Sequence, residues 1–239
     1  MKPKSKSGFT LVEMLVVLSI ILLLLTIILP AMSLARSHTR MVRCQYNQRE
    51  LMMGQMVYAS DNFTAPAHPN WLGKENGSSP NNMGYAGWLY KYPKRAAIQD
   101  LEKGALWFYL EDHDVYRCMD HKQPWGGTER ITSYCLNGSL VRYGNSNQKY
   151  YSTFHLNKWK PEDIWYWETH DESNWWNDGS NYPHEFATGR HNLGGNRGAG
   201  NVAMVGGAVK WLSEIEYYDL AFSSSKNHLW NVPDSANGR

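Results

Sequence analysis

The sequence predicts an α+β protein, in which one long N-terminal α-helix packs on a small antiparallel β-sheet with long loops. Three observations predict this class: an apolar run over residues 9–29, a helical apolar pattern that continues to about residue 60, and short β-type segments between Gly- and Asn-rich stretches. The 239 residues suffice for one domain and an anchoring segment. We expect a basic segment at 1–8, a membrane-spanning helix at 9–30, its amphipathic continuation at 31–62 and an extracytoplasmic head at 63–239.

The apolar run at residues 9–29 has the length and composition of a membrane-spanning helix. As a helix it would be about 30 Å long, which is the thickness of the hydrocarbon core of a bilayer. Lys2, Lys4 and Lys6 precede it, and this positive-inside pattern places the rest of the chain outside the cytoplasm. The run is longer than the apolar region of an ordinary signal peptide, and no Ala-x-Ala-like cleavage site follows it.

Glu13 is the unusual residue of this run. A carboxylate inside a membrane span costs about 2–3 kcal/mol even on lenient insertion scales, so its presence invites a functional explanation. One interpretation is that Glu13 lies near the interface and its side chain reaches the headgroups. The other is that a second molecule supplies its partner, because a buried charge that only a partner satisfies sets the register of an assembly.

The segment Gly8 to Glu13, Gly-Phe-Thr-Leu-Val-Glu after a Lys-containing leader, resembles the processing site of type IV prepilins and type II secretion pseudopilins. In that family a prepilin peptidase cuts after the glycine, and the new N-terminal residue is methylated. The resemblance implies that residues 1–8 are a leader peptide, that cleavage falls between Gly8 and Phe9, and that Phe9 is N-methylated. It also implies that Glu13 has no partner in its own helix and meets the Phe9 amine of a neighbouring subunit.

The helical pattern continues beyond Pro30, a residue at which a helix can kink or locally melt. Apolar residues then recur at spacings of 7, 3, 7 and 7, which trace one helix face: Leu34, Met41, Cys44, Leu51 and Tyr58. We therefore predict a single helix to about residue 60, first within the membrane and then against the head.

The head is predicted from shorter signals. The sequence predicts a loop at residues 61–87 and a short helix at 101–110. Segments of β type follow at 115–118, 131–136, 140–143 and 164–167. A hairpin joins 201–205 to 208–212 through Gly206 and Gly207, because a Gly-Gly pair permits the positive φ angles of a two-residue turn. Ser213 and Glu216 then resemble a capping box that opens a helix ending at Leu220.

The chain also resembles a large bacterial subfamily of prepilin-like proteins, at residues 43–48, at 57–62 and in shorter stretches further on. That subfamily ends its head with a histidine, a glycine-containing stretch and a strand–Asp-Gly–strand hairpin. His191 matches the histidine, but Gly206 and Gly207 stand where Asp-Gly is usual.

Three cysteines, Cys44, Cys118 and Cys135, lack the short spacing of a zinc knuckle. In an exported head one disulfide is plausible and one thiol remains free, and the sequence leaves all three pairings open. The subfamily commonly has cysteines at the positions of Cys44 and Cys118, so the resemblance implies a disulfide between these two.

Two groups of oxygen-bearing side chains raise the question of metal binding. The ligands at 111–121 lie too close in sequence to converge without special geometry, and we interpret them as solvated surface. A calcium loop is the better candidate, because hard oxygen ligands surround a turn glycine there: Asp171, Glu172, Asn174 and Asp178. His191 and the glycines after it lack the Gly-Lys-Ser/Thr ending of a phosphate loop, so we interpret His191 as a structural hydrogen-bonding residue. We expect no cofactor other than this calcium ion.

Aromatic residues gather at Trp165, Tyr166 and Trp167, and again at Trp175 and Trp176. In regular strand alternation Trp165 and Trp167 share one face. We interpret the cluster as core, from the ordinary burial of aromatic residues. The alternative is an exposed platform that grips sugars or a partner surface.

Two functions follow. The first is a structural subunit of a type IV pilus or type II secretion pseudopilus, single-pass in the inner membrane with its head in the periplasm or in an extracellular filament. Its partners would be the prepilin peptidase, other pilin or pseudopilin subunits and the inner-membrane assembly platform. The second is a membrane-anchored module whose aromatic head recognises a glycan or a protein. No residue constellation indicates an enzyme, and a formal net charge of +2 argues against a nucleic-acid binder. Major or minor subunit, and pilus or pseudopilus, stay open.

Overall fold

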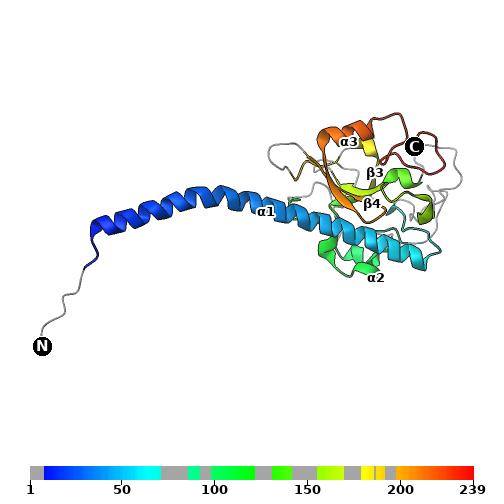
Figure 1. Cartoon of the computed structure of the whole chain (residues 1–239). Helices are drawn as coiled ribbons and strands as arrows, with labels where there is room; N and C mark the ends of the chain where they lie inside the picture. Colours follow the sequence, from blue (N-terminus) through cyan, green and yellow to red (C-terminus); the bar gives the residue numbers. More distant parts are fainter. Residues whose placement is uncertain are drawn as a thin grey trace. The chain divides into compact units, whose positions relative to one another are not determined.

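The structure, a computed structural model, describes residues 8–70, 86–91, 98–121, 131–141, 155–169, 179–185, 187–191 and 198–239. The chain divides into two compact units, Met1–Thr39 and Arg40–Arg239. The first contains the N-terminal part of helix α1 (Leu11–Asp61), and the second contains the rest of α1 and every other described element (Figure 1). The predicted α+β class is confirmed.

Helix α1 is one unbroken helix of 51 residues, and it continues through Pro30 without local melting. It ends at Asp61, close to the predicted boundary. Within the second unit the predicted apolar stripe is buried at Met41, Cys44 and Leu51. Leu34 is 59% exposed, because it belongs to the first unit, in which the helix is the only described element.

A five-stranded sheet forms the centre of the second unit, with the strand order β3-β1-β2-β4-β5. The strands are β1 (Tyr134–Asn137), β2 (Ile164–Glu168), β3 (Ser180–Asn181), β4 (Gly198–Met204) and β5 (Val209–Ser213). β1 pairs in parallel with β3, and the other three pairs are antiparallel. The sheet is therefore mixed, and the prediction of a purely antiparallel sheet is wrong at this one edge.

Each face of the sheet carries its own apolar cluster. On one face Tyr166 and Ala203 pack with Leu51 and Met52 of α1. On the other face Trp167, Val202 and Leu212 pack with Tyr217 of α3 (Glu214–Ala221), and the rings of Trp167 and Tyr217 lie 6.3 Å apart edge to face. The predicted capping box is confirmed, because Ser213 and Glu216 exchange both bonds at the start of α3.

Strand β2 contains a register irregularity between Ile164 and Tyr166. A bulge inserts one residue and shifts the alternation of the side chains that follow. As a result Trp165 joins Tyr166 in the cluster of α1, whereas Ile164 and Trp167 belong to the cluster of α3. The prediction that Trp165 and Trp167 share a face is wrong for this reason.

The predicted hairpin, which β4 and β5 form, is confirmed, but its turn differs from the predicted one. The Met204 carbonyl accepts from Gly207 N at 2.9 Å, and Met204 N donates to the Ala208 carbonyl at 2.8 Å. Residues 205–207 thus form a three-residue loop, in which Gly207 alone of the two glycines has positive φ, at 80°. This is the arrangement of a hairpin loop that ends in a glycine bulge.

Short helical turns replace two of the predicted β segments. The region 115–118 overlaps η3 (His113–Tyr116), a 3-10 turn whose first residues are capped by Asp112, which accepts from Asp114 N at 2.8 Å. The region 140–143 overlaps η4 (Gly138–Val141), and its last two residues lie outside the described residues. The predicted helix at 101–110 is divided between η2 (Ile98–Lys103) and α2 (Trp107–Leu110).

Candidate functional site

The predicted processing site lies just before helix α1. Gly8, Phe9 and Thr10 are not helical, and all three are exposed. An exposed peptide outside regular secondary structure is the form in which a backbone is open to proteolysis. The predicted scissile bond between Gly8 and Phe9 therefore lies in a suitable local conformation, two residues before the helix begins.

Thr10 and Glu13 form a capping box at the start of α1. Glu13 Oε2 accepts from Thr10 N and from Thr10 Oγ1, both at 2.7 Å, and Glu13 N donates to Thr10 Oγ1 at 3.3 Å. Met14 N donates to the Thr10 carbonyl at 3.2 Å, which is the first bond of the helix. These contacts satisfy amide groups that a helix N-terminus leaves unpaired.

The expectation that Glu13 has no partner within its own helix is therefore wrong. The signal that was missed is the Thr-x-x-Glu spacing, which is a capping-box pattern readable from the sequence. Both bonds go to Oε2, and among the described residues Oε1 accepts none. Glu13 is thus held in a fixed orientation and retains one carboxylate oxygen for a second partner.

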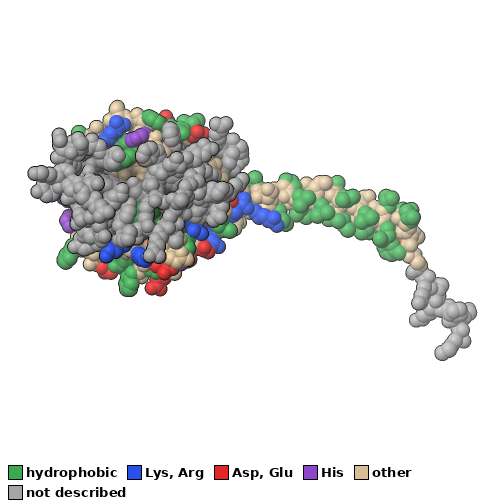
Figure 2. Space-filling model, turned by 180° about the vertical axis from the view of Figure 1, so that it is seen from behind, with side chains coloured by type: hydrophobic (Ala, Val, Ile, Leu, Met, Phe, Trp, Pro, Cys, Tyr) green, Lys and Arg blue, Asp and Glu red, His purple; other side chains and the backbone are tan. Residues whose placement is uncertain are grey.

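The N-terminal part of α1 is apolar on all sides and exposed on all sides. Phe9 and the apolar residues that follow it to Leu34 are each 43–81% exposed. α1 contains a window with a mean hydropathy of 3.0, none of it buried, and its length and composition are sufficient to cross a membrane. Figure 2 shows hydrophobic side chains covering this part of the helix. A helix that is hydrophobic all round requires an apolar environment.

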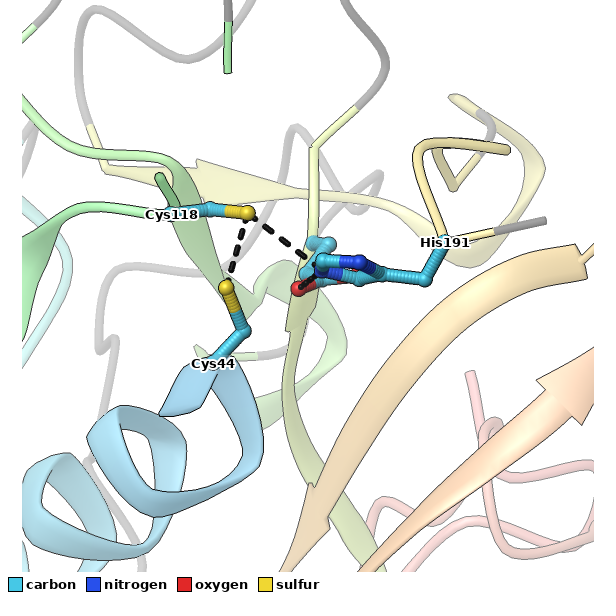
Figure 3. Close-up of side chains that lie close together, drawn as sticks. Cys44, Cys118 and His191 are labelled. Atoms are coloured by element: carbon cyan, nitrogen blue, oxygen red, sulfur yellow. Dashed lines mark hydrogen bonds and ion pairs between the residues drawn. The ribbon is translucent and has the colours of Figure 1, made fainter. Parts of the chain in front are cut away.

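The structure brings Cys44 and Cys118 together in the second unit. Cys44 Sγ lies 2.8 Å from Cys118 Sγ, and both residues are buried free cysteines (Figure 3). Cys135 is also buried, but it lies on the opposite side of the sheet and its thiol faces the Trp167 carbonyl. The Cys44–Cys118 disulfide stays a prediction. Of the three cysteines, these are the two whose sulfur atoms lie next to each other.

His191 and Glu168 complete a buried polar cluster with these cysteines. His191 Nε2 lies 3.3 Å from Cys118 Sγ and 3.0 Å from Glu168 Oε1. His191 was predicted to be a structural hydrogen-bonding residue, and it has these partners in the structure. Glu168 was not predicted from the sequence. A single glutamate at the end of an aromatic strand carries no local signal of such a partnership.

The charges of this cluster depend on one another. Burial lowers the pKa of His191, but its hydrogen bonds to Cys118 and Glu168 and the charge of Glu168 raise that pKa to about 10. Burial raises the pKa of the Glu168 carboxyl, but His191, the charge of Arg190 and the Asn201 amide together outweigh burial, so the pKa of Glu168 is lowered. The pair is therefore an imidazolium beside a carboxylate when nothing else occupies the cluster.

The aromatic strand is core. Trp165, Tyr166 and Trp167 are all fully buried, so the alternative of an exposed platform is wrong for these three residues. Trp175 and Trp176 lie outside the described residues, as do the proposed calcium ligands Asp171, Glu172, Asn174 and Asp178. Calcium binding stays a prediction.

An apolar, exposed helix that begins at Leu11, shortly after Gly8, and has the acidic residue Glu13 in its first turn fits a membrane-anchored protein of the pilin-like class. The comparison with protein-family models agrees: residues 3–29 match the family described as the prokaryotic N-terminal methylation motif. This motif is consistent with a type IV prepilin-like or pseudopilin-like protein. Comparisons with curated proteins and with solved structures found no match.

Proposed function

We propose that this chain is a structural subunit of a type IV pilus or type II secretion pseudopilus. It is inserted in the inner membrane with its head in the periplasm, cleaved by a prepilin peptidase between Gly8 and Phe9, and methylated at the Phe9 amine. It then assembles with other subunits on an inner-membrane platform. The observation that carries this proposal is the apolar, exposed helix with the methylation motif at its start.

The capping box supports a defined role for Glu13 in assembly. Glu13 Oε2 accepts both bonds from Thr10, and Oε1 accepts none among the described residues. The positively charged Phe9 amine of a neighbouring subunit would satisfy Oε1, because a charge-assisted bond is favourable where no water competes. The carboxylate is then neutralised only in the assembled filament, which sets the register between subunits.

The test uses the full chain expressed with a prepilin peptidase and an assembly system. Intact mass reports loss of residues 1–8 and methylation of Phe9, and sedimentation reports filaments. We expect Glu13→Ala to be processed and methylated, because the bond between Gly8 and Phe9 is unchanged. We expect it to remain unassembled, because it lacks the carboxylate. Ser19→Ala is the matched control, because the Ser19 hydroxyl donates to the Leu15 carbonyl of the same helix.

Thr10→Ala separates capping from assembly. This variant loses the cap but keeps the Glu13 carboxylate, so we expect it to assemble better than Glu13→Ala. Filaments formed by Glu13→Ala at the wild-type level would contradict the proposed role of Glu13. An uncut chain in the presence of active peptidase would contradict the subunit proposal as a whole.

A further inference from the structure

Four side chains of metal-ligand type converge inside the second unit, from four separate segments of the chain. Cys44 lies on α1, Cys118 follows η3 and His191 precedes β4 (Figure 3). Glu168 is the last residue of β2. One ligand atom from each lies within 4.8 Å of the others, and all four residues are buried. The sequence spacing that excludes a zinc knuckle does not bear on a site whose ligands are brought together by the fold.

We propose that Cys44, Cys118, Glu168 and His191 bind one zinc ion. Two thiolates, an imidazole and a carboxylate are the ligand types of zinc, and four ligands complete its tetrahedral shell. Bond lengths of about 2.0–2.3 Å place tetrahedral ligand atoms about 3.3–3.8 Å apart. The observed separations are 2.8 Å between the sulfurs, 3.3 Å from Cys118 Sγ to His191 Nε2 and 3.0 Å from His191 Nε2 to Glu168 Oε1. Two of these separations are shorter than that range, so an ion requires outward movement of up to about 1 Å at the sulfur pair and of about 0.3 Å between His191 Nε2 and Glu168 Oε1.

The surroundings orient the ligands in the way that metal sites require. A zinc-bound histidine donates its other ring N–H to a carboxylate or carbonyl, which holds the ring and strengthens the ligand. His191 directs Nε2 to the cluster, and its Nδ1 lies 3.2 Å from Asp120 Oδ2. Asp120 is in turn paired with Arg40 of α1. Glu168 is held through Oε2, which accepts from Asn201 N at 3.0 Å.

The charge balance favours a cation at this position. Two thiolates and the Glu168 carboxylate carry three negative charges, against two positive charges on a zinc ion. The charge of the Arg190 guanidinium stabilises the Glu168 carboxylate and supplies the remaining positive charge. Asp120 and Arg40 form an ion pair and neutralise one another. Without a cation the two thiols keep their protons, so zinc binding would release protons as the thiolates form.

A closed site of four protein ligands is structural, because it leaves no position for substrate. Zinc at this position would join α1 to the central strand β2 and to the two segments that carry Cys118 and His191. It would therefore fix the head to the helix that enters the membrane. This role is independent of whether the chain forms filaments.

The test uses the full chain, purified in detergent from cells supplied with zinc. Elemental analysis measures zinc per chain, and alkylation followed by mass analysis counts free thiols before and after a chelator. We expect one zinc per chain and two thiols that react only after the metal is removed. Cys135→Ser is the matched control, since this buried cysteine lies outside the cluster, and it should retain the zinc. Cys44→Ser, Cys118→Ser and His191→Gln should lose it.

Cobalt exchange in the wild-type chain keeps the proposal testable if those variants fail to fold. Bound cobalt should show thiolate-to-metal absorption and the visible bands of a tetrahedral ion. Purified chain with two free thiols and no zinc or cobalt uptake would overturn the proposal in favour of a hydrogen-bonded network. A Cys44–Cys118 disulfide in the purified protein, without metal, would overturn it in favour of a covalent bond.

Discussion

The hydrogen bond between Gln55 of α1 and Tyr166 of β2 should be a principal polar link between the helix and the sheet. Gln55 Nε2 donates to Tyr166 Oη at 2.7 Å and to the Ala67 carbonyl at 3.2 Å, and Gln55 Oε1 accepts from Ala67 N at 2.8 Å. Gln55 and Tyr166 are both fully buried, and Ala67 is 1% exposed. A buried polar group that loses its partner costs about 1–3 kcal/mol.

These contacts give the expected sizes of three variants. Gln55→Leu leaves the Ala67 N–H and the Tyr166 hydroxyl without this partner, so it should lower the free energy of unfolding by about 2–5 kcal/mol. Tyr166→Phe removes one bond and should cost about 1 kcal/mol. The double variant should cost about 1 kcal/mol less than the sum, because the orphaned hydroxyl is then absent.

The assay is denaturant unfolding of the full chain in detergent, followed by the fluorescence of the buried tryptophans. Gln45→Leu is the matched control on the same helix, since Gln45 is only partly buried and bonds Asn201 Oδ1 at 3.0 Å. It should cost less than about 1 kcal/mol. Strictly additive effects of Gln55→Leu and Tyr166→Phe would refute the inferred coupling between helix and strand.

Three further predictions concern the head. Burial lowers the pKa of His68, so the unfolded chain binds a proton there more readily than the folded chain does. The contribution of His68 to stability should therefore be fully present above pH 6.5 and be lost below it, by at most about 1.4 kcal/mol per pH unit. His68→Gln should flatten this slope in unfolding curves between pH 7.5 and 5, and an unchanged slope would assign it to other groups. Ser213→Ala removes the capping box with Glu216 and should cost about 1 kcal/mol, whereas Ser213→Asn should retain most of the stability; equal losses would contradict the capping role. Gly200→Ala should lower the melting temperature, because Gly200 has a φ of 95° and a Cβ there would lie 2.6 Å from Glu168 Oε2; a neutral result would contradict this close approach.

Local patterns in the sequence were sufficient for the features that depend on residues close along the chain. The apolar span, the helix to Asp61 and the Ser213–Glu216 box depend on composition or on spacings of three and four residues. The Thr10–Glu13 box is also a local feature, because it depends on the Thr-x-x-Glu spacing alone. The hairpin of β4 and β5 was located by its glycines, but which glycine adopts positive φ depended on the register of the strands.

Only the tertiary structure decided what depends on distant segments. The parallel pairing of β1 with β3 and the bulge that turns Trp165 toward α1 arise from packing of the whole sheet between two apolar clusters. The meeting of Cys44 with His191 joins residues separated by most of the head, and no spacing rule connects them. The sequence alone determined which segment is long and apolar enough to span a membrane, because length and apolarity are local properties. The buried cluster depended on the fold, because burial and proximity are properties of the packed chain.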